Sequence, residues 1–294
     1  MAPTELLTPS AAARAKQLEI FARTRVEGFL KSHNRSRLKG LSVEFFQHRM
    51  YLPGDDLRSV DWRIFARSDR LVTREFEEFT NLDAVLAVDV SGSMAYGRDG
   101  MAKIEFARHC AAMLAYVLHI QNDRSGLALV GGTLRDYLPP GGGRKHMAEL
   151  FRRLAGAEPE GATDLSGGIL SLGRRIHRKS VVAVFSDGYQ DPAAIARAIG
   201  ILRAQGHDGI FFQVYDPAET DLEFAGFTQF RDLENGQLDA TDPAEIRRAY
   251  QEVFRSHQGT LRDGLARFGV AFHPLPVQEN WDEALAAVLR TRSA

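Results

Sequence analysis

From residue 84 to the C-terminus, short apolar runs rich in β-branched residues alternate with longer stretches in which apolar side chains recur every three or four positions. The short runs are typical of strands buried on both faces, and the longer period is typical of helices. The predicted strands are 84–89, 126–130, 181–185, 210–215 and 270–272, and the predicted helices are 104–120, 146–154, 165–176, 193–204 and 243–267. This alternation predicts an α/β fold with a doubly wound, mainly parallel sheet and helices on both faces.

Two further segments complete the expected fold. Residues 134–138 follow a Gly131-Gly132 turn too short for a crossover helix, so they are expected to form an antiparallel edge strand. Residues 10–31 place apolar side chains on one helix face, which predicts an amphipathic N-terminal helix. The expected apolar positions are Leu18, Phe21, Ala22, Val26, Phe29 and Leu30. We expect residues 1–80 to pack on a main domain formed by 81–294.

Composition narrows the class of protein. The chain has 294 residues, 44% of them hydrophobic, and a net charge of -1, a balance that argues against a general nucleic-acid binder. A single cysteine, Cys110, cannot form an intramolecular disulfide, and no Cys/His cluster has zinc spacing. No apolar run approaches the ~20 residues that cross a bilayer, and the N-terminus has no export pattern. The expected location is therefore the cytoplasm, without membrane attachment.

Oxygen-bearing side chains cluster where strands are expected to end. Asp89, Ser91 and Ser93 follow the first main strand, and Asp187 follows the strand 181–185. Thr163 precedes the helix predicted to start at 165. Ligands of open α/β sheets bind outside the carboxyl ends of the strands, so these five residues are expected to converge.

This donor set favours a hard cation. Two carboxylates and three hydroxyls, without Cys or His, suit Mg²⁺ or Mn²⁺ better than zinc. Two negative charges held about 5 Å apart repel by roughly 3 kcal/mol at an effective dielectric of about 20, and a cation between them removes that penalty. Each residue also has a purely structural interpretation. Asp89, Ser91, Ser93, Thr163 and Asp187 are all residue types that cap helices or form turns.

The set of motifs resembles the von Willebrand factor A domain with its metal-ion-dependent adhesion site. The motifs are Asp-x-Ser-x-Ser, a later Thr-Asp loop and a strand ending in Ser-Asp-Gly. The resemblance implies that Ser91, Ser93 and Thr163 are direct metal ligands. It implies that Asp89 and Asp187 bind the metal directly or through water. It also implies an open coordination position that an acidic side chain of a partner fills.

A second block of residues indicates a more specific family. Residues 44–75 are similar to the signature of bacterial domain-of-unknown-function family fifty-eight. The matching residues are Arg49, Tyr51, Pro53, Gly54, Asp55, Asp56, Arg58, Asp61, Trp62, Ala66 and Arg67. The later segments 230–234 and 246–250 also look like the family. Its members often accompany MoxR-type AAA+ ATPases, and many carry transmembrane helices before the signature. With an amphipathic helix in that place, this chain resembles the short cytoplasmic branch.

The signature block carries many charges around one aromatic residue. Its arginines and aspartates are numerous enough for a paired network around a buried Trp62. Such a network could dock the block onto the main domain, or it could form a contact surface for an ATPase or its client.

Three functions are compatible with these patterns. The favoured one is a non-enzymatic, metal-dependent protein-interaction module, an adaptor or co-chaperone for a MoxR-type ATPase that binds a client protein through an acidic residue. The alternative is a metal-dependent phosphatase or hydrolase, but Ser91 stands where a haloacid-dehalogenase-like phosphatase has its second aspartate. The third is nucleic-acid binding through the basic stretches 23–39 and 174–179, which also fit solvated helix ends.

Overall fold

The computed structural model describes residues 9–32, 45–51, 60–68, 70–76, 82–97, 100–162, 164–224, 226–231, 233, 236–278 and 280–289. The chain divides into two compact units, one made of residues 1–34 and 82–294 and the other of residues 35–81. This division differs from the expected one, because the N-terminal helix belongs with the main domain. The expected packing of the signature block on that domain stays a prediction.

A six-stranded sheet forms the centre of the larger unit. Its strands are β3 (Asp83–Asp89), β4 (Arg124–Val130), β5 (Leu134–Gly141), β6 (Val181–Ser186), β7 (Asp208–Tyr215) and β10 (Ala271–Pro276). They lie in the order β10-β7-β6-β3-β4-β5. Every neighbouring pair is parallel except β4 and β5, which are antiparallel as expected for the edge strand. The predicted α/β fold with a mainly parallel sheet is confirmed.

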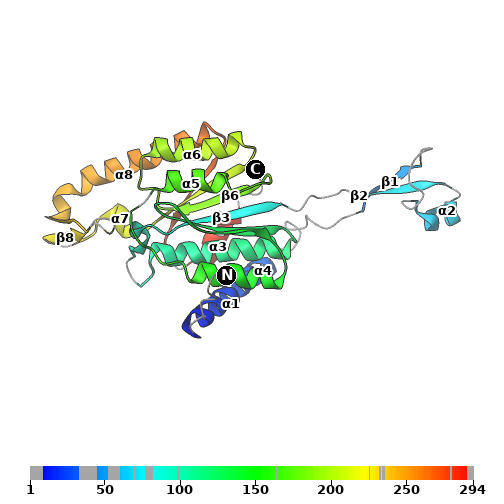
Figure 1. Cartoon of the computed structure of the whole chain (residues 1–294), viewed down its shortest axis with the longest axis horizontal. Helices are drawn as coiled ribbons and strands as arrows, with labels where there is room; N and C mark the ends of the chain where they lie inside the picture. The colour runs from blue at the N-terminus through cyan, green and yellow to red at the C-terminus, as the bar shows by residue number, and fades with distance from the viewer. Residues whose placement is uncertain are drawn as a thin grey trace, which may run out of the picture. The chain divides into compact units, whose positions relative to one another are not determined.

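Helices cover both faces of this sheet (Figure 1). The long ones are α1 (Pro9–Ser32), α3 (Lys103–Ile120), α4 (Arg144–Ala155), α5 (Leu165–Gly173), α6 (Pro192–Ala204), α8 (Pro243–Ala266) and α9 (Trp281–Leu289). Helices α5, α6 and α8 lie on one face, and α3, α4 and α9 lie on the other. The predicted helices are confirmed to within a few residues. The largest difference is at the end of α5, which stops at Gly173 rather than at 176.

The core consists of two layers because β3 is buried on both sides. Leu86 and Val88 point into the layer shared with α3 and α4, whereas Val85 and Ala87 point into the layer shared with α5, α6 and α8. Alternate residues of a strand face opposite sides of a sheet, so a strand between two layers must be apolar throughout. Cys110 lies fully buried in the first layer, and burial raises the pKa of its thiol.

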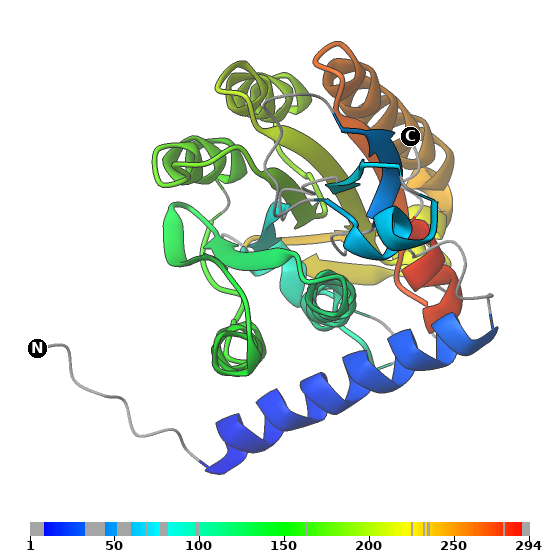
Figure 2. The same cartoon turned by 90° about the vertical axis from the view of Figure 1, so that its right-hand side faces the viewer.

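Helix α1 adds an outer layer to the first face. It lies across α3, α4 and α9 (Figure 2). The predicted apolar positions Leu18, Ala22 and Val26 are buried there. The ring of Phe21 packs edge-on against His109 of α3 and Trp281 of α9, with centroids 4.4 and 4.8 Å apart.

The smaller unit contains an antiparallel pair, β1 (Phe45–Met50) with β2 (Val72–Phe76), and the short helix α2 (Trp62–Ser68). Trp62, which the sequence analysis expects to be buried, is 55% exposed within this unit, so the unit by itself does not bury it. Asp61 caps α2 by accepting a hydrogen bond from Arg63 N at 3.0 Å, which places Trp62 in the first turn. The buried residues here are Val60 and Thr73, which form a β-bridge.

Several short elements were not predicted. They are the 3₁₀ turn η3 (Gly92–Ala95), helix α7 (Pro217–Asp221) and the hairpin of β8 (Thr228–Arg231) with β9 (Leu238–Thr241). Helix α9 was not predicted either. Across the residues that the structure describes, no helix is long and apolar enough to cross a bilayer.

The packing of α1 and α9 on His109 predicts a pH effect on stability. Burial lowers the pKa of His109 below its ordinary value of 6.5, so the unfolded chain takes up this proton before the folded one does. The stability that a neutral His109 provides is present above pH 6.5 and is lost as the pH falls further. His109→Gln should therefore lose less unfolding free energy than the wild type between pH 7.5 and pH 5.5, as measured by urea denaturation. Equal losses would contradict this assignment.

Candidate functional site

Asp89 ends β3 and is held in one orientation by two hydrogen bonds. Its side chain lies in the interior, 1% exposed. One carboxylate oxygen, Oδ1, accepts from the Ser91 amide at 2.9 Å, and the other, Oδ2, accepts from the Ser186 hydroxyl at 2.5 Å. Because Ser186 ends β6, this second bond ties the carboxyl ends of two neighbouring strands together.

The turn after β3 brings the two predicted serines together. The hydroxyls of Ser91 and Ser93 are 3.1 Å apart. Gly92 between them sits against other backbone segments, since a Cβ there would lie 2.5 Å from the Leu233 carbonyl and 3.1 Å from the Gly161 carbonyl. Only glycine allows this close approach, which brings three segments distant in sequence to one place.

Thr163 itself lies outside the described residues, but its loop is anchored at the site. The amide of Gly92 donates to the Gly161 carbonyl at 2.9 Å, and the amide of Glu160 donates to the Val90 carbonyl at 3.0 Å. Asp164 caps α5 by accepting from the Gly167 amide at 2.8 Å. The loop that carries Thr163 therefore lies beside the turn that carries Ser91.

Asp187 is fully buried after β6 and pairs with a lysine. The ammonium of Lys103, at the start of α3, lies 2.9 Å from Asp187 Oδ2 and 2.8 Å from Glu219 Oε1 of α7. Lys103 is 0% exposed, and its Nζ also lies over the ring of Tyr189, 4.6 Å from the centroid. A protein cation thus occupies the space between two of the carboxylates.

The pKa shifts reflect the crowding of negative charge. Burial, together with the charge of Asp187, raises the pKa of Asp89 from 3.8 to about 6. Burial also raises the pKa of Glu219. For Lys103, burial lowers the pKa, but the carboxylates of Asp187 and Glu219 outweigh it and hold the pKa above 10.5. When all are ionised, Asp187 and Glu219 share one ammonium and Asp89 is close enough to Asp187 to be affected by its charge, so these four described groups carry a net charge of -2.

These residues fit a hard divalent cation. The described donors are carboxylate and hydroxyl oxygens, and the net charge of -2 on the four described ionisable groups is equal and opposite to the charge of Mg²⁺. Among the residues that the structure describes, no three His, Cys, Asp or Glu side chains form a metal-binding group, so a cation here needs the serine hydroxyls as ligands. Asp89 and Asp187 already accept hydrogen bonds from protein donors. This arrangement suits carboxylates that reach a metal through water.

Comparison with known proteins identifies the family. The model of the family "Protein of unknown function DUF58" matches residues 47–260. The chain belongs to this family. An uncharacterized protein of Mycobacterium tuberculosis, Rv1480, is similar to this DUF58 chain at 26% identity, over 96% of this chain and 89% of its own length. The uncharacterized protein YeaD of Bacillus subtilis is 29% identical over 40% of this chain and 27% of its own length.

A solved structure shows the same fold. BatB from Bacteroides thetaiotaomicron superposes with a TM-score of 0.50 at 16% identity, covering 72% of the DUF58 chain and 98% of its own. The SpRpn10 VWA domain superposes with a TM-score of 0.42 at 13% identity, covering 70% of this chain and 94% of its own. The family expected from the signature block is thus shown, and the α/β fold is shared with BatB.

Three residues of the site were not predicted from the sequence: Lys103, Ser186 and Glu219. Ser186 stands directly before Asp187, at the strand end where the oxygen donors were sought, so its position was available as a signal. Lys103 begins the first helix after the serine turn, and a lysine at the start of an apolar helix opposes the helix dipole. That unfavourable placement could have indicated that Lys103 pairs with an acidic residue. Glu219 lies in a helix of five residues that no pattern predicted.

Removing the lysine tests this charge balance. Lys103→Met leaves the buried carboxylates of Asp187 and Glu219 without their cation, and breaking a buried ion pair in this way costs about 3–5 kcal/mol of unfolding free energy. Chemical denaturation with chelator present measures the loss. Lys145→Met, at an exposed position in the first turn of α4, serves as the matched control and should change the stability of the DUF58 chain by less than about 0.5 kcal/mol. A Lys103→Met protein as stable as this control would contradict the ion-pair assignment.

Proposed function

We propose that this chain is a metal-dependent protein-binding module. Ser91, Ser93 and Thr163 bind Mg²⁺ or Mn²⁺ directly, with Asp89 and Asp187 as direct or water-mediated ligands. An acidic side chain of a partner completes the coordination. The chain itself catalyses no reaction. Its work is to bring a partner to a defined surface.

The observation that carries this proposal is the uncompensated charge at the strand ends. Buried carboxylates are costly unless they are paired. Asp187 and Glu219 share the single ammonium of Lys103, and Asp89 accepts hydrogen bonds from the neutral Ser91 amide and Ser186 hydroxyl. A divalent cation supplies the missing charge. Once bound, it turns a negative site into one that attracts an acidic group, so that metal and partner bind together.

We further propose that the partner machinery is a MoxR-type AAA+ ATPase and its client protein. The support is the family itself, together with the resemblance of the signature block and of the C-terminal segments. In this arrangement the module acts as an adaptor or co-chaperone, and the ATPase supplies the energy to mature or activate a protein complex.

Calorimetric titration tests the metal site. Mg²⁺ added to the wild type should give saturable heat, and Asp89→Ala should remove most of it, because the mutation deletes one of the site's carboxylates. The matched control is Asp191→Ala, which deletes an exposed aspartate four residues after Asp187. It should bind Mg²⁺ like the wild type. Equal heats from wild type and Asp89→Ala would refute the site. Hydrolysis of a generic phosphate ester that Asp89→Asn abolishes would favour the hydrolase alternative.

Co-purification tests the proposed partner. The MoxR-type ATPase from the same genome, mixed with tagged wild-type chain, should be retained in the presence of Mg²⁺. Asp89→Ala should retain at least about tenfold less, a loss of about 1.4 kcal/mol or more in binding. Because the ATPase itself uses Mg²⁺, Asp89→Ala is a cleaner comparison than chelation. Equal retention by wild type and Asp89→Ala would show that the ATPase does not bind through the metal.

A further inference from the structure

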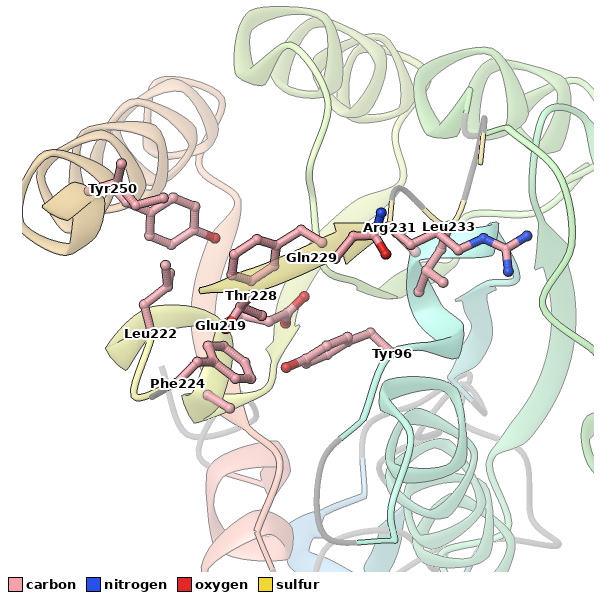
Figure 3. A pocket seen from close by; sticks show the side chains of 13 residues that line it. Tyr96, Glu219, Leu222, Phe224, Thr228, Gln229, Arg231, Leu233 and Tyr250 are labelled. Atoms are coloured by element: carbon pink, nitrogen blue, oxygen red, sulfur yellow. The ribbon is translucent and has the colours of Figure 1, made fainter. Parts of the chain in front are cut away.

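A large cavity opens directly beside the candidate metal site. It has a volume of about 520 Å³ and lies between the serine turn, α7, β8 and the start of α8. Figure 3 shows side chains from these separate segments converging on it, including Tyr96, Leu222 and Tyr250. Ser93 lines the cavity, and its hydroxyl is also 3.1 Å from that of Ser91. Ser93 therefore belongs both to the cavity wall and to the candidate metal site.

The walls of the cavity are suited to an apolar group. Aromatic and aliphatic side chains such as Tyr96, Phe230 and Ile246 form most of the lining. Among the described lining residues, only Glu219 and Arg231 carry a charge. Glu219 is paired at 2.8 Å with Lys103, an ammonium that it shares with Asp187. A pocket of this size and lining holds one large apolar side chain with room to spare.

The surface around the cavity is also apolar and exposed. Phe227 precedes β8 and is 79% exposed, and Leu233 and Leu238 in the same hairpin are 43% and 55% exposed. Large apolar side chains gathered at the edge of a pocket are typical of a protein-binding surface. The exposed Arg231 lies among them and favours a partner segment of negative charge.

We propose that the cavity and the metal site form one docking surface for a partner segment of defined chemistry. The segment carries an aspartate or glutamate for the metal and, two to four residues away, an aromatic or large aliphatic side chain for the cavity. Alternate side chains of an extended segment lie about 6.6 Å apart on the same side, so such a segment reaches both positions. This inference rests on the proposed function, because the acidic group needs the metal.

The test uses a display library of random linear peptides, selected on the wild-type chain in the presence of Mg²⁺. The enriched peptides are synthesised, and their affinities are measured by fluorescence polarisation. We expect them to pair an acidic residue with an aromatic or large aliphatic one. Ile246→Glu, which places a charge in the cavity, should weaken their binding at least about tenfold. Asp89→Ala, or chelation of Mg²⁺, should weaken it to a similar extent.

Val253→Glu is the matched control for Ile246→Glu. It lies on the same helix, 68% exposed and outside the cavity lining, so it should change peptide affinity by less than about twofold. Tyr250→Ala is a second cavity variant that introduces no charge, and it should also weaken binding. Thermal unfolding of each variant shows whether a loss of binding comes from a loss of folding.

The outcomes separate this inference from the proposed function. If the enriched peptides lack an apolar residue, or bind Ile246→Glu and Tyr250→Ala as tightly as the wild type, the proposed role of the cavity is refuted. The proposed metal site is not affected by that result. If the peptides need the cavity but bind equally well to Asp89→Ala and in the presence of chelator, the proposed role of the metal in binding is refuted. The proposed function is then refuted as well. A selection that enriches no peptide also overturns the inference. If sedimentation shows a wild-type dimer that Ile246→Glu dissociates and Val253→Glu does not, the surface belongs to a second copy of the chain.

Discussion

The buried ammonium of Lys103 is the interaction on which the carboxyl edge of the sheet depends. It lies within 3 Å of carboxylates from two separate segments, Asp187 after β6 and Glu219 in α7. Without that cation, the carboxylates of Asp187 and Glu219 would lie close together unpaired, with Asp89 near Asp187, in a place that water barely reaches. With it, the negative charge is reduced but not removed. The site is thus stable enough to fold and keeps a net negative charge, which is the basis of the proposed cation binding.

The same contact connects the candidate metal site to the apolar cavity. Glu219 belongs to the cavity lining, and Asp187 belongs to the candidate ligand set. One lysine side chain therefore touches both parts of the proposed docking surface. Ser93 provides a second connection through its position in the turn after β3. A partner that fills both parts would contact a single, continuous surface built on the end of a rigid sheet.

Glycine makes the convergence of these segments possible. Gly92 lies where the Leu233 and Gly161 carbonyls approach the turn too closely for any side chain. The loop before α5 and the β8–β9 hairpin are thereby held against the turn that carries Ser91 and Ser93. The backbone bonds from Gly92 to Gly161 and from Glu160 to Val90 fix the first of these contacts. The site is thus a property of packed backbone segments as much as of its polar side chains.

The amino-acid sequence by itself determined the sheet, its helices and the strand ends at which Asp89 and Asp187 stand. These features follow from local periodicity, because apolar runs and helical spacing are visible within a dozen residues. Short elements such as α7 and the β8–β9 hairpin were not found, since a few half-exposed residues carry little periodic signal. The tertiary structure alone decided that Lys103 pairs with Asp187, 84 positions later, and that a cavity forms between four separate segments. These contacts depend on how the layers of the fold pack together, and a local sequence pattern does not contain that information. For the same reason only the structure showed that, within the smaller unit, Trp62 is exposed whereas Val60 and Thr73 are buried.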